Sequence, residues 1–75
     1  MLVVGTIYAK TLTIGSTSAA RDWEDAYEIA SHMIEAQGIQ ATDEVMEALK
    51  DDNEYYYEAP DHAESWNVQI FELGE

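Results

Sequence analysis

The 75-residue chain has only three Lys and Arg residues, no cysteine and a single proline. Because binding to a phosphate backbone needs a basic surface, the shortage of bases argues against direct binding to DNA, RNA or an anionic membrane. The lack of cysteine excludes disulfides and thiolate metal sites, and it is typical of a cytoplasmic protein. The length predicts one domain, residues 1–75, and argues against a multidomain enzyme.

Acidic residues, in contrast, are abundant: 16 Asp and Glu give a formal net charge of −13. Disordered acidic chains are poor in aromatic residues, whereas this one is 47 % hydrophobic and has two Trp, five Tyr and one Phe, which predicts a small core. The charge is also uneven. Residues 1–21 hold two bases and no acid, hence +2, while residues 22–75 hold sixteen acids and one base, hence −15. This distribution predicts a negative face.

The start of the chain is rich in β-branched residues. Seven of the thirteen residues from 2 to 14 are Val, Ile or Thr, which predicts a strand. This run fits either one long strand or a hairpin that turns near residues 9–11. We expect one strand, because the dipeptides typical of a tight hairpin turn, Asn-Gly and Asp-Gly, do not occur there. Residues 15–18 form a polar break that offers several helix N-caps.

The middle of the chain is expected to form two helices. Apolar residues recur at three- and four-residue spacing from about Ala19 to Gln37, which is the pattern of a helix that buries one face. Gly38 is placed to end this helix. Thr42 is expected to cap a second helix, which runs from Asp43 to about Asp51.

The last part of the chain is expected to form two paired strands. The tyrosine-rich run 53–58 and the alternating run 66–73 are typical of strands and should form a hairpin, with Pro60 ending the first strand. The predicted element order is therefore β-α-α-β-β. The fold class that follows is α+β, with a three-stranded, mainly antiparallel sheet and the helices packed on one of its faces.

Acids in the two predicted helices are spaced so that they form rows. Four helical residues rise about 6 Å, which is comparable with the spacing of phosphates along one DNA strand. Like charges at this spacing repel one another, and the chain does not relieve the repulsion with Lys. The rows therefore indicate a surface that imitates phosphates. Its candidate residues are Asp22, Glu24, Asp25, Glu28 and Glu35 in the first helix, and Asp43, Glu44, Glu47, Asp51 and Asp52 in the second.

Glu54 and the three tyrosines that follow it, Tyr55, Tyr56 and Tyr57, are candidates for the same interface. Successive strand residues point to opposite faces, so we expect at least one of these tyrosines at the surface. An exposed tyrosine beside carboxylates favours Arg, which stacks on the ring and pairs with the acid. Trp23 is a further candidate aromatic anchor. The alternative role for these rings is packing in the core or at a sheet edge.

The sequence carries no motif for catalysis or metal binding. It has no nucleophile elbow, phosphate-binding loop or zinc-hydrolase motif, and the hydroxyl cluster 16–18 has no neighbouring histidine. The acidic segment 51–55 departs from the EF-hand order, and neither His32 nor His62 has the neighbours of a closed metal site. We therefore expect no enzymatic activity, no cofactor and no metal.

In size, acidity and mix of strands and helices, the chain resembles small phage-encoded anti-CRISPR proteins, in particular those that mimic double-stranded DNA. The residues that carry the resemblance are Asp22, Glu24, Asp25 and Glu28 together with Asp43, Glu44, Glu47, Asp51 and Asp52. The resemblance concerns overall character and not a motif. It implies a non-enzymatic inhibitor in the cytoplasm of a bacterial host. The acidic face would occupy the basic site where a type I CRISPR Cascade complex, with type I-C as one candidate, reads the protospacer-adjacent motif.

Two other functions stay open on the sequence alone. One is an acidic accessory or structural protein of a phage or a halophile, whose charge serves solubility. The other is an antitoxin-like protein-interaction module. Both would have an acidic surface without a DNA-binding protein as its partner.

Overall fold

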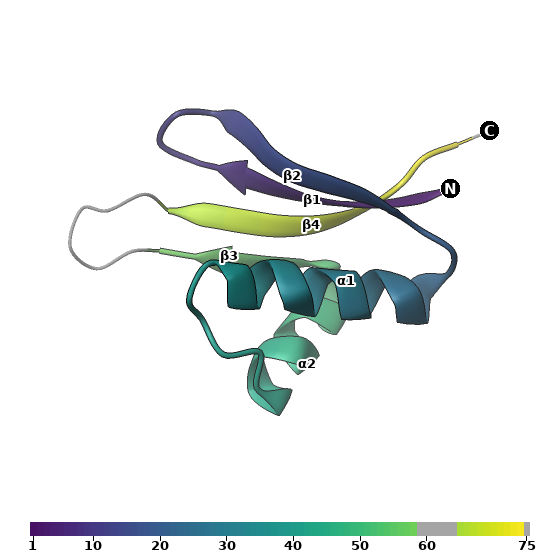
Figure 1. Ribbon diagram of the computed structural model, residues 1–75. Coiled ribbons are helices and arrows are strands. Elements are labelled where there is room, and N and C mark those ends of the chain that lie inside the picture. The colour runs from purple at the N-terminus through teal and green to yellow at the C-terminus, as the bar shows by residue number, and fades with distance from the viewer. Residues whose placement is uncertain (59–64, 75) are drawn as a thin grey trace.

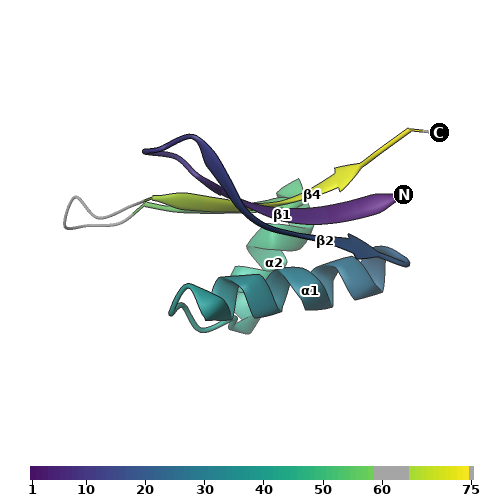
Figure 2. The same ribbon diagram turned by 45° about the horizontal axis from the view of Figure 1, so that its top comes forward.

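Six elements follow one another in the computed structural model, which describes residues 1–58 and 65–74 (Figure 1). In chain order they are β1 (Leu2–Tyr8), β2 (Thr13–Ala20), α1 (Trp23–Ala36), α2 (Asp43–Asp52), β3 (Glu54–Tyr57) and β4 (Trp66–Glu72). The strands form one antiparallel sheet in the order β2-β1-β4-β3. Helix α1 lies against one face of this sheet, whereas α2 lies beside the edge strand β3 (Figure 1, Figure 2), and the α+β class is confirmed.

The prediction of one strand over residues 2–14 is wrong, because the chain turns and forms the β1–β2 hairpin. The sheet consequently has four strands and not three, and the order begins β-β-α. The turn uses four residues, 9–12, instead of the two-residue loop that Asn-Gly or Asp-Gly would mark. Leu12 takes the left-handed conformation with φ of 55°, a position that a sequence pattern normally signals with Gly or Asn.

Helix α1 begins later than predicted, because β2 continues to Ala20. Its N-cap is Asp22 and not a residue of the polar break 15–18, which lies within β2. The helix ends as predicted: Gly38 has φ of 91°, and its N–H donates to the carbonyl of Glu35.

Helix α2 matches its predicted start. The Thr42 hydroxyl caps it by accepting a hydrogen bond from the Val45 N–H at 3.3 Å. Asn53, in the left-handed conformation, ends the helix and leads directly into β3. The β3–β4 pairing is also confirmed, with Tyr55 opposite Val68. The predicted role of Pro60 lies outside the described residues.

The core lies between the sheet and the two helices. Helix α1 packs on β1, β2 and β4, whereas α2 packs on β3. Ala26 and Ala30 are fully buried, and their small side chains let α1 lie close to the sheet. The larger buried side chains of the core are Leu2, Val4, Ile34, Leu49, Trp66, Val68 and Ile70. Because the buried residues of each helix are apolar and face the sheet, the acids of both helices are left on the outside.

Candidate functional site

Nine acids of α1, α2 and the α1 N-cap have exposed side chains, and we call them the helical acid surface. They are Asp22, Glu24, Glu28, Glu35, Asp43, Glu44, Glu47, Asp51 and Asp52. In the part of the chain that the structure describes, no Lys or Arg forms a salt bridge with any of the nine. The surface is therefore an uncompensated set of carboxylates, which makes the electrostatic potential around both helices negative.

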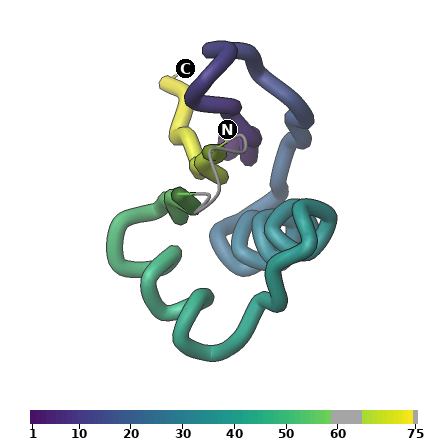
Figure 3. The backbone as a smooth tube through the Cα atoms, turned by 90° about the vertical axis from the view of Figure 1, so that its left-hand side faces the viewer, coloured from purple at the N-terminus to yellow at the C-terminus, as the bar shows by residue number. Residues whose placement is uncertain are grey.

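The two helices differ in the regularity of their acid rows. In α2, Asp43, Glu47 and Asp51 follow one another at four-residue spacing, so this row continues over two helical turns. In α1, Glu24 and Glu28 are one turn apart, and Glu35 lies about two turns further on. The helices are not parallel: Figure 3 shows α1 nearly end-on, whereas α2 lies across the view. The two rows therefore cross and do not run side by side like the strands of a duplex.

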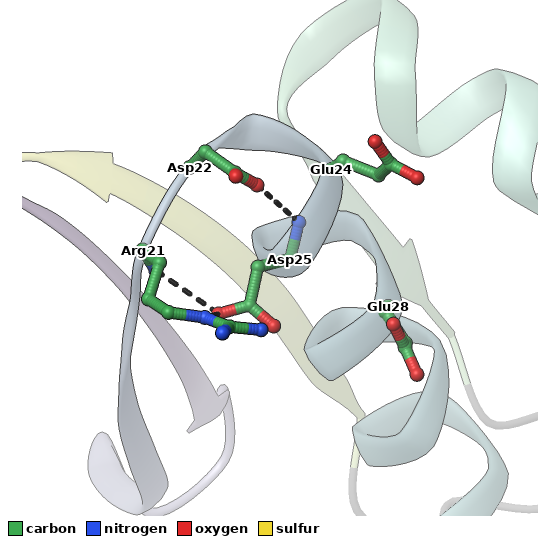
Figure 4. A pocket seen from close by; sticks show the side chains of 5 residues that line it. All are labelled: Arg21, Asp22, Glu24, Asp25 and Glu28. Atoms are coloured by element: carbon green, nitrogen blue, oxygen red, sulfur yellow. Dashed lines mark hydrogen bonds and ion pairs between the residues drawn. The ribbon is translucent and has the colours of Figure 1, made fainter.

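Asp25, a predicted member of the acid rows, is engaged in capping α1 (Figure 4). Its carboxylate accepts a hydrogen bond from the Arg21 backbone N–H at 3.0 Å and lies 3.6 Å from the Arg21 Nε. In return, the Asp25 N–H donates to the Asp22 carboxylate at 2.8 Å. This reciprocal arrangement satisfies two backbone donors at the start of the helix. The Arg21 N–H, followed by the guanidinium charge, holds the pKa of Asp25 below its ordinary value.

The capping pair borders a shallow depression of about 220 Å³ at the start of α1. Arg21, Asp22, Asp25, Glu24 and Glu28 line it. Figure 4 shows that the carboxylates of Glu24 and Glu28 lie apart from the hydrogen-bonded group. These two acids are therefore free to meet a partner, whereas Asp25 stabilises the helix start.

Replacing Asp25 by Asn is expected to lower the melting temperature at neutral pH, because the amide keeps an acceptor but loses the charge. Since the native pKa of Asp25 is lowered from 3.8, its stabilising contribution is complete above that value and is lost as the pH falls through the native pKa. The difference between variant and wild type should therefore vanish in acid. Thermal denaturation followed by circular dichroism at neutral and strongly acidic pH measures it. Glu28→Gln, which removes an exposed acid outside the cap, is the control, and an equal loss there would contradict the capping role.

The tyrosine run alternates between the two sheet faces, as predicted. Tyr55 and Tyr57 turn toward the helix side, where their ring centroids lie 6.1 Å and 5.2 Å from that of Trp66. Tyr56 is 51 % exposed and faces the opposite side. These three rings therefore do not form one cluster, and the structure does not place Tyr56 beside the helical acid surface.

Glu54 also lies on the sheet face that the helices leave free. Its carboxylate accepts hydrogen bonds from the side-chain amides of Asn67, at 3.2 Å, and Gln69, at 2.7 Å. Asn67 Oδ1 is buried without a hydrogen-bond partner among the described residues. The structure thus separates Glu54, like Tyr56, from the acids of α1 and α2.

Trp23 lies at the start of α1 and remains 38 % exposed. Its ring is 6.0 Å from that of Tyr27, over which Lys50 of α2 places its ammonium group at 5.5 Å. Tyr27 donates a weak hydrogen bond of 3.4 Å to Asn53. Sequence reasoning missed this contact between Lys50 and Tyr27, because nothing local in either helix signals a contact between them. Lys50, the one base in α2, is therefore directed toward the Tyr27 ring.

Among residues 1–58 and 65–74, no group of three or more His, Cys, Asp or Glu side chains could hold a metal ion. His62 lies outside the described residues, and His32 is exposed on α1. The described helices include none that is long and apolar enough to cross a membrane.

Comparisons of the chain with protein-family models, with curated proteins and with solved structures found no match.

Proposed function

We propose that the protein is a non-enzymatic inhibitor that binds a DNA-handling protein at its DNA site. The observation that carries this proposal is the helical acid surface, nine exposed carboxylates without a salt bridge to any described Lys or Arg. Unrelieved repulsion weakens a small fold, and a basic partner would remove it. Together with the resemblance to acidic anti-CRISPR proteins, this makes the site where a type I Cascade complex reads DNA our candidate target.

The α2 row is the part of the surface that imitates a phosphate backbone best. Asp43, Glu47 and Asp51 present three carboxylates at intervals of about 6 Å along the helix. Lys and Arg side chains of the partner pair with these carboxylates as they pair with phosphates. Glu24 and Glu28 of α1 extend the negative surface in a second direction, and the long-range field of the whole set raises the association rate.

Trp23 is the candidate aromatic anchor of this interface. Charges at the rim of an interface contribute little affinity, whereas aromatic rings at its centre often contribute much. Trp23 precedes Glu24 and is partly exposed, so an arginine of the partner can stack on its ring while pairing with the acid. Tyr55, Tyr56, Tyr57 and Glu54 are not needed for this mode of binding.

A competition experiment tests the proposal. Purified type I-C Cascade is bound to a fluorescent duplex that contains its protospacer-adjacent motif, and the acidic protein is added while anisotropy is followed. We expect the duplex to be released in proportion to the protein that binds. Binding of the protein without release of the duplex, or no binding to this or any other type I Cascade, would contradict the proposal.

The crossing of the two helices favours a second candidate, an acidic accessory protein whose charge serves solubility. Two rows that cross do not reproduce the two parallel backbones of a duplex. This candidate predicts that the charges of the helical acid surface can be reversed without functional loss, whereas the inhibitor depends on their sign.

A further inference from the structure

The sheet has a second face that neither helix covers (Figure 1, Figure 2). Residues directly opposite each other in the register share a face, and Val4 and Val68 are buried on the helix side. The alternate positions therefore point away from the helices. We call this surface the open sheet face. Its apolar side chains are Val3, Ile7, Ile14, Ala19, Tyr56 and Phe71, and Thr17 of β2 and polar side chains from β3 and β4 lie between them.

The open sheet face carries apolar and uncharged polar side chains and is almost free of charge. Ile14 is 68 % exposed, Tyr56 51 % and Phe71 38 %. Phe71 also lies across β1, with a ring carbon 3.7 Å from the place that a Cβ of Gly5 would take. Within the four strands, Glu54 is the only charged residue on this face, and its carboxylate is hydrogen-bonded by two side-chain amides. A chain with a net charge of −13 thus has a single charged residue on this face of its four strands.

We infer that two copies of this chain associate through their open sheet faces, sheet against sheet. Packed sheets lie about 10 Å apart, and a helix layer adds about 10 Å on each side, so the acids of the two copies are separated by about 30 Å. That is nearly four Debye lengths of about 8 Å at physiological salt, so the acids hardly repel. Association through the helices would instead bring both helical acid surfaces together. Charge therefore favours the open sheet face as the contact between copies.

The size of the face decides how strong this contact is. The four strands hold 26 residues, and at about 3.3 Å per residue and about 4.8 Å between strands they cover roughly 410 Å². Two such faces bury about 820 Å², which is below the lower limit of about 1,000 Å² for a specific interface. The dimer is consequently weak and forms in a concentration-dependent way. It leaves the helical acid surface of each copy exposed, so the inference does not depend on the proposed function.

Sedimentation equilibrium of the wild type and of Ile14→Glu and Tyr56→Glu tests the inference. These substitutions place a carboxylate at opposite margins of the open sheet face, in β2 and β3, where both side chains are exposed in the monomer. We expect the wild type to dimerise at about 100 μM and each variant to weaken association at least about tenfold. Leu12→Glu is the matched control, because Leu12 is 83 % exposed in the β1–β2 turn, outside the strands that form the face. It should dimerise like the wild type.

Three outcomes would overturn the inference. The first is a wild type that stays monomeric at this concentration. The second is a dimer that resists Tyr56→Glu but not Ile14→Glu, since that result points to pairing through the β2 edge. The third is a dimer that dissociates when salt is added, because a contact between faces that carry almost no charge should not weaken when charges are screened. Circular dichroism of both variants checks that they fold.

Discussion

Changing Glu47 and Asp51 together to Lys is expected to abolish competition with DNA. Both acids are exposed on α2, and their reversal places two positive charges where the proposed mechanism requires phosphate-like ones. Attraction to partner bases becomes repulsion, and we expect the affinity to fall at least about hundredfold. The fold should be kept, because Lys is a good helix former and the change near the end of α2 also suits the helix dipole. Anisotropy competition measures the first effect, and circular dichroism the second.

The matched control reverses two acids outside the helices. Glu58→Lys with Glu72→Lys changes the net charge by the same amount, and both side chains are exposed. If competition depends on the helical acid surface, this control competes almost as well as the wild type. Equal loss in both double variants would mean that bulk charge is what matters. Full competition by the α2 variant would contradict the proposed site and favour the solubility function.

Truncating Leu49 to Ala is expected to lower the free energy of unfolding by about 3 kcal/mol, the usual cost of such a truncation in a core. Leu49 is fully buried and is the one buried residue of α2, so it fixes this helix to the rest of the domain. A domain of this size is stable by only about 4–11 kcal/mol, so the change removes a large part of the total. Five acids of the helical acid surface lie on α2, and their placement depends on the same contact.

Urea denaturation followed by tryptophan fluorescence measures the effect of Leu49→Ala. Leu12→Ala makes the same truncation at a side chain that is 83 % exposed, and we expect it to cost less than about 0.5 kcal/mol. A cost below about 1 kcal/mol for Leu49→Ala would show that the packing of α2 onto the domain differs from the structure.

Local signals made the helices predictable from the sequence. Thr42 and Gly38 mark the start of α2 and the end of α1, since a cap and a left-handed residue act within one turn. The β1–β2 hairpin was not predictable in this way. Its four-residue turn places a leucine, Leu12, in the left-handed conformation, and tertiary pairing with β1 overrides the weak local preference.

The candidate site was predictable in part, because helical periodicity is also a local signal. Helical periodicity places the acids of α1 and α2 outside the core, and the structure exposes nine of the ten. The role of Asp25 depends on where α1 starts, and an error of a few residues there hides the cap formed with Asp22. The faces taken by Glu54 and Tyr56 depend on the register of β3 against β4, which alternation alone does not fix.

The salt dependence of binding to type I-C Cascade tests the central claim most directly. If carboxylates of the helical acid surface replace phosphates, the contact is electrostatic and screening weakens it. Calorimetric titration should then show a Kd that rises at least about tenfold between roughly 0.1 and 0.5 M salt, with a smaller rise for the weakened Glu47→Lys, Asp51→Lys variant. A Kd that stays constant over this range would contradict binding in place of DNA.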